Sequence, residues 1–168
     1  VRIITDSACD LPQSVADELG ITIVPLSIRF GDEEFIDRRD LTTEQFWAKS
    51  AASAQLPETA APSPGQFEQA YRSAMTDGAT GIVVISLSAG LSATMQSAEL
   101  AARAVAGETA ISVVDSRSAT LGLGSIVAAC ARAANDGTSF DNVTAMARDL
   151  AHRTKVWGAL DTLDNLKK

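Results

Sequence analysis

The chain has 168 residues, of which 46% are hydrophobic and 21% charged, and its formal net charge at pH 7 is −7. These values exclude disordered and fibrous classes, and the length allows one domain with a sizeable core. The negative charge argues against a nucleic-acid partner, which needs a basic face. No apolar run approaches the ~20 residues of a membrane span, and Asp6 and Asp10 interrupt the pattern that a signal peptide would need.

The two cysteines, Cys9 and Cys130, are too few for a disulfide scaffold. Cys9 has no basic neighbour in sequence that would lower the pKa of a reactive thiol, so a structural role is expected for it. We therefore expect a cytoplasmic protein with reduced thiols.

Short β-branched runs alternate with Ala-rich helical patterns, which predicts an α/β fold with a mostly parallel sheet. A strand at 2–5 comes first. It is followed by a helix over 12–19 that Asp10 caps and Gly20 ends. Residues 21–30 are rich in strand-forming side chains.

Proline interrupts the next part of the chain. Pro25 predicts an edge position, a bulge or a break in the strand-rich stretch. Residues 31–39 are polar and predict a loop. A helix over 43–53 follows, with Phe46 and Trp47 as its apolar side.

Two helix starts carry cap signals. Thr42 or Thr43 caps the helix that runs to about residue 53, and Ser63 caps a helix that opens at Pro64 and runs to about residue 77. Between these helices, residues 54–64 contain three prolines and predict an ordered loop.

The rest of the chain predicts strands and helices in alternation. The strands are expected at 81–85, 110–114 and 156–160, and the helices at 92–105, 120–136, 139–154 and 162–168. The run over 81–85 is continuously apolar, as a central parallel strand requires.

Ligands of open α/β sheets bind beyond the carboxyl ends of the strands. Three such ends are rich in hydroxyls, at 5–7, 86–92 and 115–118. The middle one leads into a helix N-terminus, whose free N–H groups and partial positive charge suit a phosphate or carboxylate. Ser88 and Ser92 add hydroxyl donors there, although either could simply cap the helix.

An enzyme is the alternative interpretation of the same turn. Ser86-Leu87-Ser88-Ala89-Gly90 is similar to the G-x-S-x-G nucleophile elbow, with Ser in place of the first Gly. A Ser-dependent hydrolase or phosphoryl-transfer enzyme using the turn Ser86–Ser92 would need a base. The one histidine, His152, falls in the last turn of a predicted helix, where a protonated imidazole simply favours the helix C-terminus.

Signals for a metal or a nucleotide cofactor are weak. Asp6, Asp10 and Asp115 could converge at the sheet edge on a hard cation, but each also suits a helix cap or a turn. Gly122-Leu123-Gly124 lacks the third glycine of a dinucleotide fingerprint. We therefore expect neither a metal nor a cofactor.

Six short motifs, in order along the whole chain, resemble those of the DegV family. They are Thr5–Pro12 (T-D-S-x-x-D-L-P), Val24–Leu26 (V-P-L), Thr59–Pro64 (T-S-Q-P-S-P), Ile85–Thr94 (I-S-L-S-S-G-L-S-G-T), Val114–Ala119 (V-D-S-R-x-A) and Thr162–Lys168 (T-L-x-x-L-K-K). This chain departs from the pattern where Ala60 and Ala61 replace Ser and Gln and where Ala93 replaces Gly.

The resemblance implies a three-layer α/β/α sandwich that binds a long-chain fatty acid and is not itself an enzyme. It implies that the hydroxyls of Thr59 and Ser92 hold the fatty-acid carboxylate, with Ser88, Ala89 and Gly90 close by. It also implies a partner, a fatty-acid kinase that phosphorylates the bound carboxylate.

The resemblance further implies that residues 1–154 form the N-terminal α/β domain and that 155–168 begin a second, truncated domain. We therefore expect the chain to be the N-terminal piece of a longer protein. The apolar side chains of 156–168 then need another cover. We expect this segment to pack back on the first domain or to exchange with a second copy in a homodimer.

Overall fold

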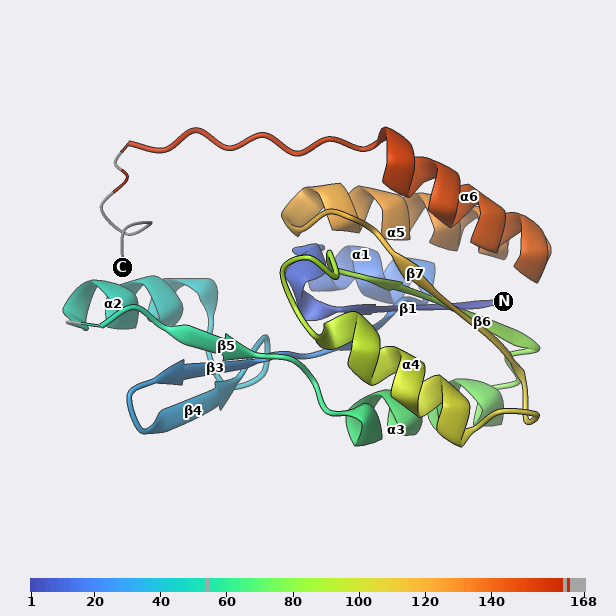
Figure 1. Cartoon of the computed structure of the whole chain (residues 1–168), viewed down its shortest axis with the longest axis horizontal. Coiled ribbons are helices and arrows are strands. Elements are labelled where there is room, and N and C mark those ends of the chain that lie inside the picture. The colour runs from blue at the N-terminus through green and yellow to red at the C-terminus, as the bar shows by residue number, and fades with distance from the viewer. Residues whose placement is uncertain (54, 162, 164–168) are drawn as a thin grey trace.

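The computed structural model of the chain describes residues 1–53, 55–161 and 163, and its centre is a four-stranded parallel sheet (Figure 1). The strands lie in the order β2-β1-β6-β7, with β1 at Arg2–Asp6, β2 at Thr22–Val24, β6 at Gly81–Ser86 and β7 at Ala110–Asp115. Every residue of β6 is buried, which confirms the prediction of a central parallel strand from its continuous apolar run.

Helices cover both faces of this sheet (Figure 1). One face carries α1 (Gln13–Leu19), α5 (Thr120–Asn135) and α6 (Phe140–Arg153), and the other carries α3 (Pro64–Thr76) and α4 (Thr94–Ala104). Successive residues of β1 point to opposite faces, so Ile3 and Ile4 lie in separate apolar cores. The predicted three-layer α/β/α sandwich is confirmed.

A second, antiparallel sheet lies beside the main one (Figure 1). Its order is β4-β3-β5, with β3 at Ser27–Phe30, β4 at Glu33–Ile36 and β5 at Glu58–Ala60, and α2 (Thr43–Ala52) lies next to it. The predicted loops over 31–39 and 54–64 are therefore wrong where β4 and β5 form. Of the edge position, bulge or break predicted at Pro25, the structure has a break, because the chain leaves the main sheet after β2 and enters the small one at β3.

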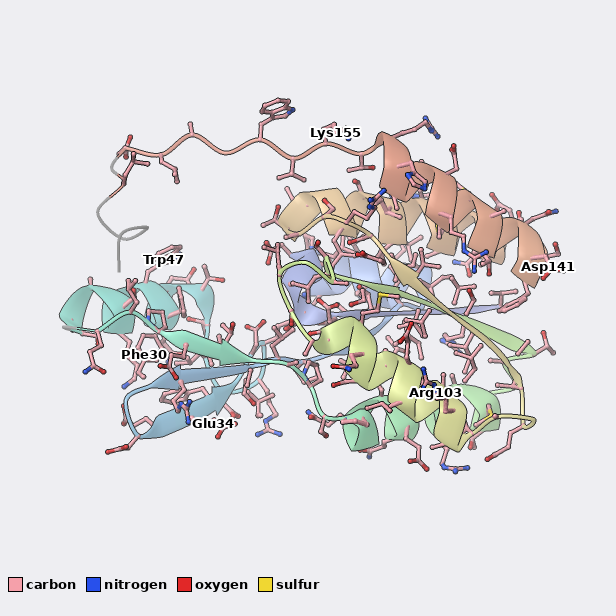
Figure 2. All side chains as sticks on the ribbon, viewed as in Figure 1. Phe30, Glu34, Trp47, Arg103, Asp141 and Lys155 are labelled. Carbon is pink, nitrogen blue, oxygen red and sulfur yellow. The ribbon has the colours of Figure 1, made fainter. Side chains whose placement is uncertain are left out.

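The apolar side of α2 is only partly as predicted. The Phe46 ring packs 5.8 Å from the ring of Phe30, measured between centroids. Trp47 is 64% exposed (Figure 2), although its ring lies 5.1 Å from that of Phe46 between centroids in a T-shaped arrangement. Phe46 therefore packs against the small sheet. The prediction that Phe46 and Trp47 together form the apolar side of α2 is wrong for Trp47.

The N-caps predicted at Thr42 and Ser63 are confirmed. Thr42 and Ser63 each form a capping box with the glutamine three residues later. The assignment of Asp10 as cap of α1 is wrong, because Pro12 occupies that position without a side-chain bond. Asp10 instead closes a short 3-10 helix, η1 (Ser7–Cys9), in a left-handed conformation with φ 51°.

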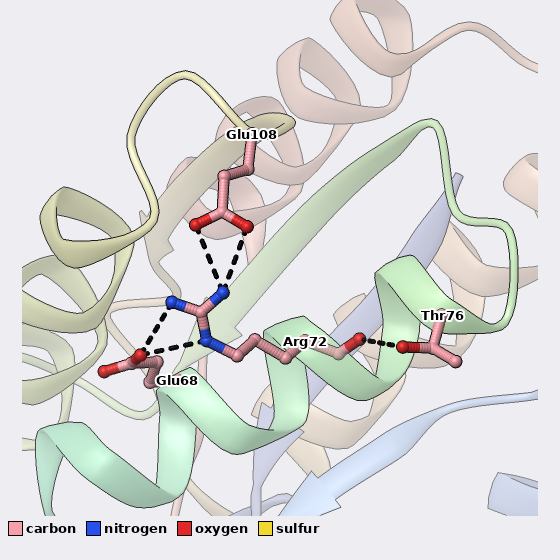
Figure 3. Close-up of polar contacts among 4 residues, drawn as sticks. All are labelled: Glu68, Arg72, Thr76 and Glu108. Carbon is pink, nitrogen blue, oxygen red and sulfur yellow. Dashed lines mark hydrogen bonds and ion pairs between the residues drawn. The ribbon is translucent and has the colours of Figure 1, made fainter.

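An ion network joins α3 to the turn between α4 and β7 (Figure 3). The Arg72 guanidinium donates to Glu68 at 3.0 Å and to both carboxylate oxygens of Glu108 at 3.0 and 3.1 Å. The Thr76 hydroxyl donates to the Arg72 carbonyl at 2.9 Å. Because the network is exposed, it orients the turn more than it adds to stability.

The segment after α6 runs extended and exposed, and residues 155–160 form no strand (Figure 1). The prediction of a strand at 156–160 is therefore wrong, since β-branched and aromatic side chains there meet no strand edge. Trp157 is 90% exposed, whereas Val156 packs beside the start of α5, next to Gly122. The helix predicted over 162–168 lies outside the described residues, apart from Leu163. No helix in the described part of the chain is long and apolar enough to cross a bilayer.

Candidate functional site

The turn from β6 to α4 lies at the carboxyl end of the parallel sheet and is held by two aspartates. Asp6, at the end of β1, accepts the backbone N–H of Ala8 at 3.1 Å and that of Leu87 at 2.8 Å. Asp115, at the end of β7, accepts the N–H of Ala89 at 3.1 Å and that of Arg117 at 2.8 Å. The two carboxylates therefore tie the three neighbouring strand ends together.

Burial acts strongly on Asp6. Desolvation raises the pKa of this carboxyl from 3.8 to about 6, although the hydrogen bonds from Leu87 and Ala8 favour the charged form. The burial cost therefore outweighs the two backbone donors.

The three aspartates considered as metal ligands do not form one site. Asp6 and Asp115 are engaged with backbone N–H groups, and Asp10 lies beyond η1. Burial and the nearby Asp37 raise the pKa of Asp10. Within the described residues, no group of three His, Cys, Asp or Glu side chains could hold a metal ion.

Ser92 lies just before α4, which begins at Thr94 rather than at Ser92 as predicted. Its Oγ accepts the Thr94 N–H at 3.2 Å and lies 2.9 Å from the Thr94 hydroxyl. Thr94 is fully buried. Either hydroxyl can donate this second bond, and when Thr94 donates it the Ser92 O–H is available to an acceptor outside the protein. The turn therefore holds Ser92 as a hydroxyl that can donate.

The neighbouring residues of the turn are already bonded within the chain. Ser88 Oγ accepts the Gly90 N–H at 3.3 Å, and the Ala89 N–H goes to Asp115. Leu91 is 72% exposed beside these polar groups. The turn thus places hydroxyls next to an exposed apolar side chain, a combination that suits an amphipathic anion.

Thr59 lies in the small sheet, on the exposed edge strand β5, paired with Ile28 of β3. No hydrogen bond within the described part of the chain joins Thr59 to Ser88 or Ser92. The two residues expected to hold a carboxylate therefore come from different sheets.

A cleft of about 920 Å³ lies between the first loop of the main domain and α2. Its lining includes Asp10, Asp37, Arg38, Phe46 and Trp47. Arg38 has a left-handed φ of 65° and donates to the Leu11 carbonyl at 2.6 Å. The walls of this cleft mix charged side chains with apolar ones such as Leu11, Phe46 and Trp47, so the cleft offers an acyl chain partial apolar cover.

The second cleft, of about 550 Å³, lies at the carboxyl ends of β6 and β7 and brings Ser88 and His152 to one place. Arg117, on the loop after β7, places its guanidinium 3.2 Å from His152 Nδ1. Arginine can only donate, so Nδ1 accepts and the proton of the neutral imidazole is on Nε2. In this tautomer Nε2 cannot take a proton from Ser88, which is contrary to a Ser–His pair.

Two supporting features escaped sequence reasoning. Thr94 was considered only as part of a motif, and its bond to Ser92 depends on where the helix begins. The second cleft joins residues from two distant parts of the chain. Arg117 and Ser118 follow β7, whereas His152 is in the last turn of α6 and Lys155 comes shortly after it. The hydroxyl-rich stretch after β7 was the only available signal.

Both cysteines are free and buried, in line with the structural role expected for Cys9. Desolvation raises the pKa of Cys9, and it raises the pKa of Cys130 to about 11. Neither thiol is therefore activated as a nucleophile.

Comparison with protein families gives a match over the whole chain. The family model described as "Uncharacterised protein, DegV family" matches residues 1–168. A DegV domain-containing protein of Clostridium perfringens is 30% identical over 166 residues, covering 99% of this chain and 59% of that protein. One of Streptomyces coelicolor is 33% identical over 168 residues, covering all of this chain and 59% of that protein. The chain thus spans somewhat more than half the length of these relatives.

Solved structures give the same answer for the fold. A DegV family protein from Thermus thermophilus, described as binding fatty acid, superposes with a TM-score of 0.82 at 34% identity, over 90% of this chain and 53% of that one. A stearic acid-binding protein from Eubacterium ventriosum gives a TM-score of 0.76 at 27% identity, over 86% of this chain and 50% of that one. With the family model matched along its entire length, the chain belongs to the DegV family.

Proposed function

We propose that this protein binds a long-chain fatty acid and holds the carboxylate with the hydroxyls of Thr59 and Ser92. The observation that carries the proposal is the likeness, at 27% and 34% identity, to two structures described as fatty-acid-binding. The Ser92 hydroxyl beside the exposed Leu91 supports it, because a carboxylate needs a donor and the adjoining methylenes need an apolar contact.

The acyl tail supplies the affinity and the hydroxyls supply the orientation. Burying one CH₂ is worth about 0.8 kcal/mol, so a sixteen-carbon tail offers roughly 12 kcal/mol before the costs of binding. A carboxylate at a helix N-terminus gains only ~0.3–2 kcal/mol. Ser88 and the backbone at Ala89 and Gly90, which have partners in the chain, shape the turn around the headgroup.

Residues 1–154 then form one domain, and the segment from residue 155 onward begins a second one that covers the tail. A separate fatty-acid kinase in the cytoplasm would phosphorylate the presented carboxylate, and this protein would act as carrier. In support of a carrier, the neutral His152 accepts from Arg117 and is not arranged as a base for Ser88. A Ser-dependent hydrolase or phosphoryl-transfer enzyme is therefore the less favoured function.

The test is native mass spectrometry of the protein purified gently from its host, followed by solvent extraction and lipid identification. A bound fatty acid is expected in the natural sequence and is expected to be lost in the double variant Thr59→Ala, Ser92→Ala. A protein that carries no fatty acid, or a double variant that retains it, contradicts the proposed carboxylate site.

A matched control removes two hydroxyls elsewhere. In Thr76→Ala, Ser125→Ala, both lost hydroxyls donate only to backbone carbonyls of their own helices. This variant is expected to keep the fatty acid. When the lipid-loaded protein is incubated with ATP and no other protein, the fatty acid is expected to remain unphosphorylated. Phosphorylation under these conditions would favour the enzyme interpretation over the carrier.

A further inference from the structure

The second cleft combines cationic side chains in a chain whose net charge is negative. Its lining includes Arg117, Lys155 and His152 and, among the described residues, no Asp or Glu, and the nearby Asp115 carboxylate is bonded to the backbone N–H groups of Arg117 and Ala89. Arg117 comes from the loop after β7, and Lys155 lies directly after α6 (Figure 2). Two fixed positive charges therefore face one cavity of about 550 Å³.

Arg117 is held in place through its backbone and through its guanidinium. Its backbone N–H donates to Asp115, and the residue has a left-handed φ of 54°. Its guanidinium donates to His152 Nδ1 at 3.2 Å. A single bond to a neutral imidazole leaves most of the five guanidinium N–H donors without a partner among the described residues.

Ser118 supplies an independent sign of a missing partner. The residue is only 6% exposed, yet its Oγ forms no hydrogen bond within the described structure. It lines the same cleft as Arg117, at the start of α5. A buried hydroxyl without a partner is costly, and this Oγ lies beside Gly122, near Val156, at the wall of the cleft, so a small shift of Val156 would open it to an acceptor in the cavity.

The N-terminus of α5 adds to the field of the cleft. Ala119 is its N-cap residue and forms no side-chain cap, so the first-turn N–H groups have no side-chain acceptor. The sixteen-residue helix places its partial positive charge there. The cleft therefore combines fixed cations, an unpaired hydroxyl and a helix N-terminus.

We propose that this cleft is a binding site for a phosphate group, with Arg117 and Lys155 as counter-charges and the Ser118 hydroxyl as donor. A phosphate carries close to two negative charges and several acceptor oxygens, which matches two cations and a hydroxyl better than a single carboxylate does. Ser88 and Leu91 line this cleft and also belong to the turn of the proposed carboxylate site, whereas Thr59 and Ser92 do not line it, so variants at these two residues test the carboxylate site separately.

The experiment uses the full chain and the NMR signal of the His152 ring, assigned by its loss in His152→Gln. Inorganic phosphate is titrated against sodium chloride at equal ionic strength, because screening alone affects exposed charges. A saturable shift with phosphate and none with chloride is expected. Shifts that are equal for the two salts, or that do not saturate, overturn the proposal.

Variants locate the group. Arg117→Gln and Ser118→Ala are each expected to weaken phosphate binding, by roughly tenfold or more for the charge. Lys155→Gln lies on an exposed extended segment, so it tests the site even if Arg117→Gln fails to fold. The control Arg153→Gln removes the same charge from α6 outside the cleft, where Arg153 pairs with Asp149. Equal loss in control and test variants overturns the site.

A parallel titration with dodecyl phosphate separates two sources of the group. Tighter and saturable binding of dodecyl phosphate assigns the site to the phosphorylated head of an acyl chain. Equal affinity for the two probes assigns it to free phosphate. Failure of both probes overturns the phosphate site and leaves the fatty-acid proposal to its own test with Thr59 and Ser92.

Discussion

Asp6 shows how one buried carboxyl serves the site at a cost that depends on pH. Its pKa is raised to about 6 in the folded chain, mainly by burial. Between about pH 4 and 6 the folded state therefore holds a proton that the unfolded state has lost, so stability falls as pH rises through this window. A shift of this size is worth about 3 kcal/mol, since each pKa unit is worth ~1.4 kcal/mol.

The Asp6→Asn variant isolates this contribution. The advantage of the natural chain over Asp6→Asn in free energy of unfolding is expected to shrink by about 3 kcal/mol between pH 4 and pH 7. Urea denaturation at both pH values measures it, and the other titrating groups cancel between the variants. A difference that instead grows with pH would mean that the hydrogen bonds from Leu87 and Ala8 outweigh burial.

In the stretch Gly122-Leu123-Gly124, which only weakly resembles a dinucleotide-binding motif, Gly124 has a packing role. A Cβ on Gly124 would lie 2.3 Å from the backbone oxygen of Cys9, where α5 packs against η1. We expect Gly124→Ala to cost about 1–3 kcal/mol of stability in urea denaturation. In Gly65→Ala, where the nearest atom is 3.9 Å away, a gain of up to about 1 kcal/mol is expected. Equal effects at the two positions would refute the close approach.

Among the elements, the helices of the main layers were predictable because apolar periodicity marks each of them, and in α3 the Ser63 cap agrees with it. Phe67, Tyr71 and Ala74, spaced four and three residues apart as on one face of a helix, all lie in the core under α3. The strands β4 and β5 were not predictable, because β4 begins with two glutamates and β5 lies between prolines. Their identity comes from pairing with β3, a long-range property that local sequence does not carry.

The Ser63 cap links the small sheet to α3 and gives an element-scale prediction. The Ser63 hydroxyl oxygen accepts the backbone N–H of Gln66, and the Gln66 side-chain Oε1 accepts the backbone N–H of Ser63. Ser63→Ala is expected to lower the free energy of unfolding by about 1 kcal/mol. Ser73→Ala, inside the same helix, is the control and is expected to change stability by less than about 0.5 kcal/mol. An unchanged midpoint in Ser63→Ala would show that the cap is replaced by water.

At the scale of the whole molecule, the family motifs predicted the sandwich and the place of the turn, but not how the site is assembled. Ser92 follows β6 in the main sheet, whereas Thr59 is on an edge strand of the small one. The distance between two sheets depends on packing between distant segments, so spacing in sequence could not give it. The same reason hid the basic cleft, whose members come from the loop after β7, from α6 and from the segment after it.

The exposed segment after α6 predicts self-association. Val156, Trp157 and Leu160 present apolar surface that a single copy leaves largely open to solvent. We expect a dimer of the 168-residue chain by light scattering, and a monomer in Val156→Ser, Trp157→Ser. Trp47→Ser removes an exposed tryptophan from α2 instead and is expected to remain dimeric. A natural chain that is monomeric at all concentrations would contradict the exchange of this segment.

The same open surface limits how tightly residues 1–168 can hold a lipid. The two clefts described above mix charged and apolar side chains in their walls, so part of an acyl tail would stay in water. If only half of a sixteen-carbon tail is buried, roughly 6 kcal/mol of its transfer free energy is lost. Calorimetry with palmitate, below the concentration at which palmitate aggregates, compares this chain with a longer form that has the full length of its relatives. Residues 1–168 are expected to bind palmitate at least about hundredfold more weakly than the longer form. Equal affinity would mean that the first domain closes around the tail by itself, and it would turn attention to rearrangement of the small sheet over Ser92.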